Sequence, residues 1–418
     1  MEYKLGNLSN FYDSLHKTPK VYSTSGYPMI RVKDIETGFL NISQTANVSE
    51  VDYLEFTKKY KPTVGDIIIT RVGTYGNVAL VVKDENFCLG QNTVVLNPIR
   101  KTIDNKYLFY ALRDPYVQQQ IESKVTGSTQ KTISLKSLKE IEVKRFDYKK
   151  EILIGKFLYN IDNKIEINKK IIANLEELSQ TLFKHWFVDF EFPDEDGNPY
   201  KSSGGEMVDS ELGEIPKEWQ VVKLETLIDN VKDRINAKSV SSNFPYVPID
   251  LIPKRKLTFY NYKDGKEAKS SLIKFKRNDI LLGNMRVYFH RVCLAPFEGV
   301  TRNTVFTLRP KDEKYTYYLI NLINKDEFIE YASNNSKGST MPYAVWEGVL
   351  DKIKVIKPPL NYLNQFNSKI KNNFELSISL LEQNRKLVTL RDTLLPKLMS
   401  GEIEIPDDIE VNNDELSI

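Results

Sequence analysis

The tripeptide Gly-Ser-Thr occurs twice in this chain, and the residues around both copies align. The stretch "TGSTQKTISLKSLKEIEVKRF" begins at Thr126, and "KGSTMPYAVWEGVLDKIKVIK", which begins at Lys337, matches it with a one-residue insertion. Upstream, "GQNTVVLNPIR" matches "VTRNTVFTLRP", "GDIIIT" matches "NDILLG", and "NKYLFYAL" matches "EKYTYYLI". A single repeat with a period of about 210 residues indicates a duplicated domain and not a solenoid of short repeats.

Each copy has the sequence of a mixed α/β domain. Residues 1–147 alternate β-branched runs such as "DIIIT", "NVALVV" and "NTVVL" with Gly, Asn and Pro, and they contain a helical stretch near "NKYLFYALRDPYVQQQIES". Residues 219–358 repeat this arrangement. Short strands joined by polar loops, with an embedded helical stretch, favour two similar domains of the α/β (α+β) class.

A long helix is expected after each copy, over residues 148–190 and 359–400. From Lys149 to Lys184 there is no Pro, Gly155 is the only Gly, and apolar residues recur every three or four positions, a pattern that Asn168 and Ser179 interrupt. On a helix that is otherwise rich in Lys, Glu and Asn, such a stripe indicates a seam against a partner helix. The expected seam consists of Ile154, Leu158, Ile161, Ile165, Ile172, Leu175, Leu182, Phe366, Ile370, Phe374, Leu387 and Leu394.

The predicted architecture is two similar α/β domains separated by two long helices, which form an antiparallel coiled coil with an internal pseudo-two-fold. Residues 191–218 are rich in Pro, Gly, Ser and acidic residues without a period, so we interpret them as a connector. Residues 401–418 are interpreted as an acidic C-terminal tail with a frayed end. A helix of about 35 residues rises about 52 Å, which matches about 15 base pairs of B-DNA.

Composition narrows the class of protein. The 418 residues carry 59 Lys and Arg against 56 Asp and Glu, so a nucleic-acid partner would have to meet local basic patches and not a basic tail. The first residues lack the pattern of a secretion signal, and no run of about 18 apolar residues indicates a membrane span. Cys88 and Cys293 lie in apolar runs, which favours buried free thiols over a disulfide or a metal site.

The sequence between the two copies resembles a known family. The run "LFKHWFVDFEFPDEDGNPYKSSGGEMVDSELGEIPKEWQVVKLETL", which begins at Leu182, is similar to the signature after the first long helix in specificity subunits of type I restriction-modification systems. The closing "LRDTLLPKLMSGEIEI" resembles the end of that family's second helix. The order of domain, helix, connector, domain and helix is also the family's own, so the resemblance covers almost the whole chain.

The resemblance implies a function and a set of partners. Residues 1–147 and 219–358 would be target recognition domains 1 and 2, each of which binds one half of a bipartite, asymmetric site on double-stranded DNA, while the coiled coil sets the spacer. Two methyltransferase subunits would modify one adenine in each half-site with S-adenosylmethionine, and two restriction or motor subunits would use ATP and Mg. This chain would be a non-catalytic subunit without a cofactor, in the cytoplasm of a bacterium or archaeon.

The chain itself shows no catalytic or metal-binding pattern. It lacks the Gly-x-x-x-x-Gly-Lys-Ser/Thr loop that holds phosphates. The stretch "GNPYKS" lacks the second proline of the amino-methyltransferase motif, and "FPDEDG" lacks the Glu-x-Lys partner of a nuclease cluster. His16, His185 and His290 are dispersed and form neither a ligand set nor a triad. We therefore expect the chain alone to be catalytically silent.

Candidate DNA-contacting residues lie in polar, turn-rich segments of both copies, because base edges are read by Arg, Lys, Asn and Gln and phosphates are bound by Lys, Arg, Ser and Thr. The candidates in the first copy, within "TRVGTYGN", "GQNT" and "GSTQKT", are Arg71, Thr74, Tyr75, Asn77, Gln91, Asn92, Ser128, Thr129, Gln130 and Lys131. Those in the second copy, within "NMRVYFHR", "TRNT" and "KGSTMPY", are Asn284, Arg286, Tyr288, Arg291, Arg302, Asn303, Lys337, Ser339, Thr340 and Tyr343. The residues after Gly-Ser-Thr differ between the copies, as readers of two different half-sites would.

Several alternatives stay open at this point. The shared Asn-Thr pairs, Asn92-Thr93 and Asn303-Thr304, also fit a common turn, and "PKRKLTFYNYK" (Pro253–Lys263) fits DNA backbone binding and a solvated hairpin equally well. The alternative function is a coiled-coil scaffold whose domains bind protein, which salt-dependent binding to random DNA would distinguish. A self-sufficient methyltransferase or nuclease is disfavoured by the missing cofactor motifs.

Overall fold

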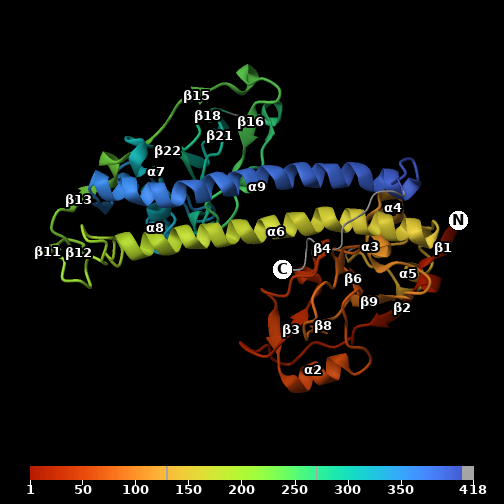
Figure 1. Ribbon diagram of the computed structural model, residues 1–418. Coiled ribbons are helices and arrows are strands. Elements are labelled where there is room, and N and C mark those ends of the chain that lie inside the picture. The colour runs from red at the N-terminus through yellow and green to blue at the C-terminus, as the bar shows by residue number, and fades with distance from the viewer. Residues whose placement is uncertain (129, 270, 407–418) are drawn as a thin grey trace. The chain divides into compact units, whose positions relative to one another are not determined.

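The structure, a computed structural model, describes residues 1–128, 130–269 and 271–406. The chain divides into two compact units, one formed by Met1–Ile165 with the chain from Leu387 onward and the other by Glu166–Lys386. Each unit contains one copy of the repeat and part of each of the two long helices, α6 (Tyr148–Phe187) and α9 (Leu360–Ser400) (Figure 1). Each long helix therefore contributes residues to both units.

The first unit is built on a sheet with strand order β2-β9-β6-β7-β4, a smaller sheet β5-β3-β8 and the pair β1-β10. Its strands are β1 (Glu2–Lys4), β2 (Ser9–Asp13), β3 (Tyr27–Ile30), β4 (Gly38–Phe39), β5 (Ala46–Val48), β6 (Ile67–Thr70), β7 (Val78–Leu80), β8 (Cys88–Leu89), β9 (Thr93–Pro98) and β10 (Glu142–Lys144). Its helical segments besides α6 and α9 are α1 (Leu5–Leu8), the 3-10 turn Val32–Asp34, α2 (Glu50–Thr57), α3 (Asn105–Arg113), α4 (Pro115–Ser123) and α5 (Leu135–Lys139). All four residues of the central strand β6 are buried, which suits its run of β-branched side chains.

The helical stretch expected near residues 105–123 is two helices. Asp104 caps the first, α3, by accepting a hydrogen bond from the backbone N of Tyr107. Asp114 then leaves the helical conformation, with φ −62° and ψ 134°. A residue that precedes proline is disfavoured in the α region, and proline suits the first turn of a helix, so the chain ends α3 and starts α4 at Pro115.

The second unit repeats this topology with additions. Its sheets have the orders β14-β22-β19-β20 and β15-β18-β21-β16-β17, with the pairs β13-β23 and β11-β12. Its strands are β11 (Met207–Ser210), β12 (Gly213–Pro216), β13 (Gln220–Lys223), β14 (Ile228–Asn230), β15 (Arg234–Ile235), β16 (Pro245–Val247), β17 (Lys263–Asp264), β18 (Leu272–Phe275), β19 (Ile280–Gly283), β20 (Val292–Leu294), β21 (Gly299–Arg302), β22 (Val305–Pro310) and β23 (Lys354–Lys357). Its helical segments besides α6 and α9 are α7 (Thr316–Ile323), α8 (Asp326–Asn334) and the 3-10 turns Leu224–Thr226, Ala237–Ser239, Ile249–Leu251, Gly265–Glu267, Val287–Phe289, Glu313–Tyr315 and Leu350–Lys352.

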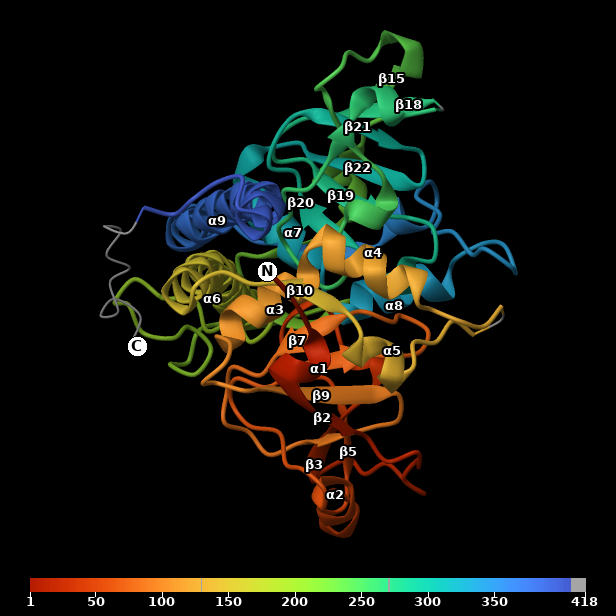
Figure 2. The ribbon, with the colours of Figure 1, turned by 90° about the vertical axis from the view of Figure 1, so that its right-hand side faces the viewer.

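The strand pairings show that the duplication extends to register. The order β2-β9-β6-β7 corresponds to β14-β22-β19-β20, and each smaller sheet has one parallel pair, β3 with β8 and β16 with β21. The α3-α4 pair corresponds to α7-α8. In the second unit β15 and β18 extend the smaller sheet (Figure 2). The sequence repeat is thus a repeat of the fold.

Helices α6 and α9 run antiparallel, and contacts within each unit show it. In the first unit Asp162 pairs with Arg391. Lys150, earlier in α6, pairs with Glu404, which follows the end of α9. In the second unit the Nδ2 of Asn168 donates to Gln383 and Asn384, and Ser179, later in α6, lies against Asn373, earlier in α9. Figure 2, seen nearly along the helices, shows them side by side.

The apolar residues expected in the seam divide into two groups. Buried in the structure are Ile154, Leu158, Ile161, Ile165, Ile172, Phe366, Ile370 and Phe374. Leu175, Leu182, Leu387 and Leu394 are only partly buried, and near the end of α9 Leu395, Leu398 and Met399 are buried instead. Ile154 and Leu158 pack into the core of the first unit, and Phe366, Ile370 and Phe374 into the core of the second. Much of the stripe therefore covers the globular domains.

Polar side chains are buried along the helices as well. The carboxylate of Asp162 in α6 binds Arg113 of α3 at 2.6 Å, Arg391 of α9 at 2.5 Å and the hydroxyl of Tyr110 at 2.8 Å. Burial raises the pKa of the Asp162 carboxyl, but the charges of the two arginines outweigh it and the net pKa is lowered. This buried charge cluster fastens the first α/β domain to both helices.

The second unit uses a different anchor. Oε1 of Glu176 accepts hydrogen bonds from the backbone N of Leu257 and Thr258, at 2.9 and 3.0 Å, and from the Thr258 hydroxyl at 2.8 Å. The guanidinium of Arg385 in α9 lies 3.8 Å from the centroid of the Tyr262 ring. The segment Pro253–Lys263 therefore packs on the helices of its own unit. The burial of Leu257, Thr258 and Phe259 excludes a solvated hairpin, while Lys254, Arg255 and Lys256 are exposed, so contact with the DNA backbone stays a prediction.

Gly155 has a packing role in α6. A Cβ built on Gly155 would lie 2.5 Å from the backbone N of Tyr107 and 2.8 Å from Oδ1 of Asp104. Glycine therefore lets the first turn of α3 approach the α6 backbone closely.

The connector and the tail have more structure than the sequence indicated. Within residues 191–218, β11 and β12 form a hairpin, and Phe192 stacks on Tyr200 and Trp219 at centroid distances of 4.6 and 4.9 Å. In the tail, Ile403 and Ile405 pack against the core of the first unit. Residues 407–418 lie outside the described part of the chain. None of the helices in the described ranges has the length and apolar character needed to cross a membrane.

Candidate nucleic-acid interface

The first unit brings three separate polar segments together into what we call the first loop cluster, Thr70–Asn77, Gly90–Thr93 and Gly127–Thr132. The backbone N of Arg71 donates to the carbonyl of Asn92 at 2.9 Å, and the carbonyl of Arg71 accepts from Ile133 at 3.0 Å. The N of Gly73 donates to the carbonyl of Lys131 at 3.2 Å. Segments that are dispersed in sequence therefore form one surface.

The second unit repeats this framework in the second loop cluster, Asn284–Arg291, Thr301–Thr304 and Lys337–Tyr343. The N of Asn284 donates to the carbonyl of Thr304 at 2.9 Å, and the carbonyl of Asn284 accepts from Ala344 at 2.8 Å. The N of Arg286 donates to the carbonyl of Pro342 at 2.7 Å. Bond for bond, this is the pattern of the first loop cluster.

Both Gly-Ser-Thr segments form the same narrow loop. Its base is a two-way backbone pairing, Thr126 with Thr132 in one copy and Lys337 with Tyr343 in the other. Gly127 and Gly338 have φ of 97° and 91°, a conformation that side chains disfavour. The tripeptide thus recurs because both loops need this turn, while Ser128, Ser339 and Thr340 at the tips are exposed. Thr129 lies outside the described residues.

Some residues predicted to contact DNA have partners within their own domains. The guanidinium of Arg71 is only 14% exposed, pairs with Asp13 at 2.8 Å and donates to the carbonyl of Ile133 at 3.1 Å. Arg291 donates to the carbonyls of Asp250 and Ile252. These two cations, predicted to face DNA, are engaged inside their own domains, because an internal acceptor lies within reach of each.

The predicted asparagines also have internal partners. Asn77 donates to the carbonyl of Ile35 at 3.0 Å, and buried Asn284 donates to the carbonyl of Asn303 at 2.8 Å. Asn92 adopts a left-handed conformation, with φ 65°. The strand register matches Asn92 with Thr304 and not with Asn303, and of the two asparagines only Asn92 is left-handed. The two Asn-Thr pairs therefore do not build a common turn, contrary to the common-turn interpretation of the sequence.

The remaining candidates present side chains at the surface of their clusters. Exposed are Thr74, Gln130 and Lys131 in the first cluster and Tyr288, Arg302, Asn303, Lys337 and Tyr343 in the second, and Tyr75, Gln91 and Arg286 are half-buried. Hydroxyl, amide and cationic groups of this kind suit phosphates and base edges. These residues make up the surface of each loop cluster that is available to a ligand.

Lys131 is held in a small network in the first loop cluster. Its Nζ lies 3.1 Å from a carboxylate oxygen of Glu122 and 3.4 Å from the hydroxyl of Tyr75, which also bonds Glu122. Hydrogen bonds from Tyr75 and Lys131 lower the pKa of Glu122, and Glu122 raises the pKa of Lys131. The lysine is therefore a fixed positive charge at neutral pH.

A polar recess beside the second loop cluster contains residues that the sequence did not single out. It has a volume of about 370 Å3, and Asn303 lines it together with Lys232, Arg234 and Glu347. Lys232 and Glu347 form an ion pair. Lys232 follows β14 by two residues, and extension of the β14–β22 register makes it the counterpart of Asp13. The charge at this position is therefore reversed between the units.

Other features of the described residues offer no reaction centre. No group of three or more His, Cys, Asp and Glu side chains in the described ranges is placed to hold a metal ion. Cys88 and Cys293 are free and buried, and burial raises the pKa of the Cys88 thiol to about 12. His290 is buried between Asn324 and Asp326. In "FPDEDG", Asp194 accepts from the backbone N of Asp196 and Asn198, which makes the segment a self-capped turn.

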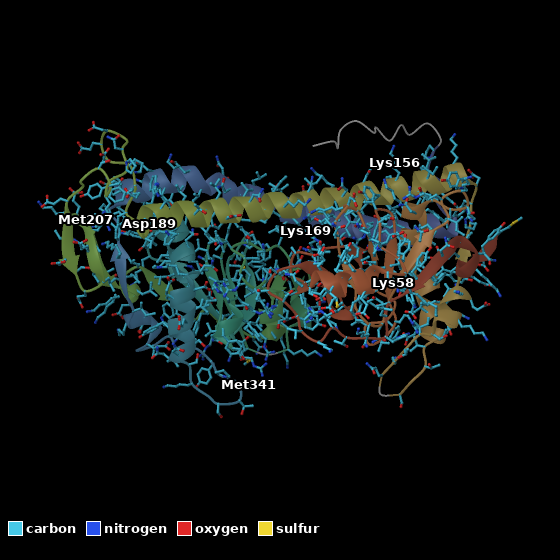
Figure 3. All side chains as sticks on the ribbon, turned by 90° about the horizontal axis from the view of Figure 1, so that it is seen from below. Lys58, Lys156, Lys169, Asp189, Met207 and Met341 are labelled. Atoms are coloured by element: carbon cyan, nitrogen blue, oxygen red, sulfur yellow. The ribbon has the colours of Figure 1, made fainter. Side chains whose placement is uncertain are left out.

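The second unit also has an apolar recess of about 430 Å3 at the end of α6. The recess is lined by residues that include Phe183, Phe187, Phe328, Tyr331 and Val355. Asp189, which follows the end of α6, is labelled in Figure 3. The recess is lined mainly by hydrocarbon, so it is suited to an apolar side chain and not to DNA.

Comparison with known proteins identifies the family. Residues 2–177 and 216–390 each match the model of the type I restriction modification DNA specificity domain. The chain belongs to this family. Its two matched segments are the two copies of the repeat with their helices, which explains why the hydrogen-bond framework is the same in both loop clusters.

The relatives cover nearly the whole chain. The type I restriction enzyme MjaIX specificity subunit of Methanocaldococcus jannaschii is 28% identical over 404 residues, which are 93% of this chain and 89% of the relative. The HindI specificity subunit of Haemophilus influenzae is 22% identical over 465 residues, with 96% and 99% covered. The crystal structure of a type I S subunit from M. genitalium matches with a TM-score of 0.60 at 15% identity and covers 95% of both chains, which shows the shared fold.

Proposed function

We propose that the chain is the DNA-reading subunit of a type I restriction-modification enzyme and that each loop cluster binds one half of a bipartite, asymmetric site. The observation that supports this most strongly is the contrast within the repeat: the backbone framework of the two clusters is the same, while the exposed side chains on it differ. A framework preserved with different exposed groups suits two readers of different sequences.

The proposal assigns chemistry to partners and none to this chain. Methyltransferase subunits would supply S-adenosylmethionine and modify one flipped adenine in each half-site, and restriction subunits would supply ATP and Mg. We take two of each as the stoichiometry and place the assembly in the cytoplasm. The chain contributes recognition, spacing and docking surfaces.

The first experiment is to co-express the chain with the methyltransferase subunit of its own system and to map methylated adenines by single-molecule sequencing. We expect a split, asymmetric motif with one methylated adenine in each part. A matched variant with Ser339 and Thr340 both replaced by alanine should alter methylation at one part only. A continuous motif, or a stable complex that methylates no DNA, would favour the scaffold function instead.

A second experiment tests the role of the helices as a spacer. An insertion of seven residues, about two turns, into both α6 and α9 keeps the helical faces in phase. We expect the spacer of the methylated motif to lengthen while both half-sites keep their sequences. Altered half-sites with an unchanged spacer would refute this role.

A further inference from the structure

The tips of the two Gly-Ser-Thr loops occupy equivalent positions and have opposite chemistry. The equivalence rests on the shared base pairing and on the carbonyl that follows each turn: a Cβ at Gly127 would meet the carbonyl oxygen of Gln130, and a Cβ at Gly338 that of Met341. Gln130 and Met341 are therefore structural counterparts. One tip carries an amide followed by a lysine, and the other carries a thioether followed by a proline.

The second tip exposes an apolar surface. Met341 is 53% exposed, and Tyr343 and Tyr288 are 48% and 50% exposed. Figure 3 shows Met341 at the end of a loop that stands out from the strands of its unit. Met285 of the Tyr288 loop pairs with Tyr343 through the backbone, so the Tyr288 loop and the Met341 loop are joined at this point. Large exposed apolar side chains gathered on one loop cluster indicate a contact surface.

Backbone hydrogen bonds fix the base of this loop. Tyr343 and Lys337 exchange both backbone hydrogen bonds, and the carbonyl of Pro342 accepts from Arg286 at 2.7 Å. This single bridge between Lys337 and Tyr343 closes a narrow loop, and the major groove of B-DNA admits narrow two-stranded elements. Exposed Lys337 at the base supplies a cation for the phosphates, as does exposed Arg302 on the neighbouring segment.

In the major groove, the apolar feature that distinguishes one base from the others is the C5 methyl group of thymine. We infer that the second loop cluster reads its half-site through apolar contact of Met341, supported by Tyr343, with thymine methyl groups, whereas the first reads through the hydrogen-bonding and charged groups of Gln130 and Lys131. This inference rests on the proposed function and deepens it. The two half-sites then differ in the kind of recognition as well as in sequence.

The test uses the full chain in complex with its methyltransferase subunit and duplexes that carry the mapped site. Each thymine is replaced in turn by deoxyuracil, which removes only the methyl group. We expect one or two positions in one half-site to weaken binding about 4-fold each, the effect of one buried methyl group. The variant M341A should lose this penalty, and M341L, which keeps an apolar side chain, should retain most of it.

The matched control is K131A in the first loop cluster. It should reduce the dependence of affinity on salt, because it removes a cation, and leave the deoxyuracil penalties unchanged. M341A should leave the salt dependence unchanged. Tryptophan fluorescence, which reports the second unit because Trp186, Trp219 and Trp346 all lie there, checks that M341A is folded.

The outcomes separate the inference from the proposed function. Deoxyuracil penalties that persist in M341A, or no penalty at any thymine, would overturn the thymine-methyl reading while site-specific binding remains. Equal affinity of the wild-type complex for the site and for a scrambled duplex would overturn the proposed function itself.

Discussion

The two units share a backbone framework and differ in how each α/β domain is fastened to the helices. In the first unit a buried carboxylate, Asp162, is surrounded by two arginines and a tyrosine hydroxyl. In the second, the carboxylate of Glu176 accepts from backbone N–H groups and a hydroxyl. Both anchors lie on α6. Duplication therefore preserved the strand and loop pattern, while each copy acquired its own solution for packing on the helices.

The largest effect is expected from D162A. The change leaves the buried Arg113, whose side chain is 7% exposed, without its partner carboxylate, and breaking a buried pair in this way costs about 3–5 kcal/mol. Denaturant unfolding of the first unit, followed by circular dichroism, should shift by this amount, while tryptophan fluorescence, which reports the second unit, should shift little. The control is K169A, which removes the exposed ion pair with Glu166 and should lower the unfolding free energy by less than about 0.5 kcal/mol. A shift seen mainly in fluorescence would contradict this assignment.

The pH dependence of the Asp162 anchor has a defined sign. Its folded pKa lies below the ordinary value of 3.8, so its stabilisation is present at neutral pH and is lost as the pH falls below about 4 toward the folded pKa. D162A should therefore differ less from the wild type at pH 3 than at pH 7.

A smaller effect is expected from E176A. The substitution leaves two buried backbone N–H groups, those of Leu257 and Thr258, without an acceptor, which costs about 2–3 kcal/mol. This shift should be visible in tryptophan fluorescence. E176Q keeps an acceptor oxygen and should therefore lose less stability than E176A. Equal losses of stability in the two variants would show that these hydrogen bonds do not fasten the domain to α6.

The loop clusters provide a third comparison. R71A removes a mostly buried ion pair with Asp13 and a hydrogen bond to the Ile133 carbonyl. We therefore expect the unfolding free energy of the first unit to fall by about 1–2 kcal/mol. K232A removes the exposed ion pair with Glu347 at the counterpart of Asp13, and we expect a loss of less than about 0.5 kcal/mol in unfolding free energy. Thermal unfolding of both variants tests the ranking, and a larger loss in K232A would reverse our view of which cluster is braced by charge.

The smallest effect is expected from D114N, and its sign is opposite to that of Asp162. Burial raises the pKa of Asp114 to about 6, so the wild-type chain loses stability as the pH rises from about 4 to 6. D114N should be more stable than the wild type at pH 7, by less than about 1 kcal/mol because the side chain is only half-buried. Unfolding at pH 4 and pH 7 measures the difference, and a destabilised D114N at pH 7 would contradict the sign.

Much of the candidate site was predictable because its frame is local. The Gly-Ser-Thr turns and the differing tip residues are visible in the aligned copies, whereas the aligned Asn-Thr pairs are one residue out of register in the structure. The roles of single cations were not predictable. Arg71 and Lys131 look alike in sequence, but Asp13, 58 residues away, neutralises Arg71 inside the domain, while Lys131 stays at the surface. Whether a cation meets an internal acceptor depends on contacts that sequence spacing does not record.

The sequence by itself determined the duplicated domain, the two long helices and the six polar segments, because repeats and helical periodicity depend on neighbouring residues alone. The tertiary structure decided which helix positions bury polar groups, why Gly155 is required, and that Pro253–Lys263 packs on the helices of its unit. It also brought three distant segments into each loop cluster. These features depend on partners far away in the chain, and only folding selects them.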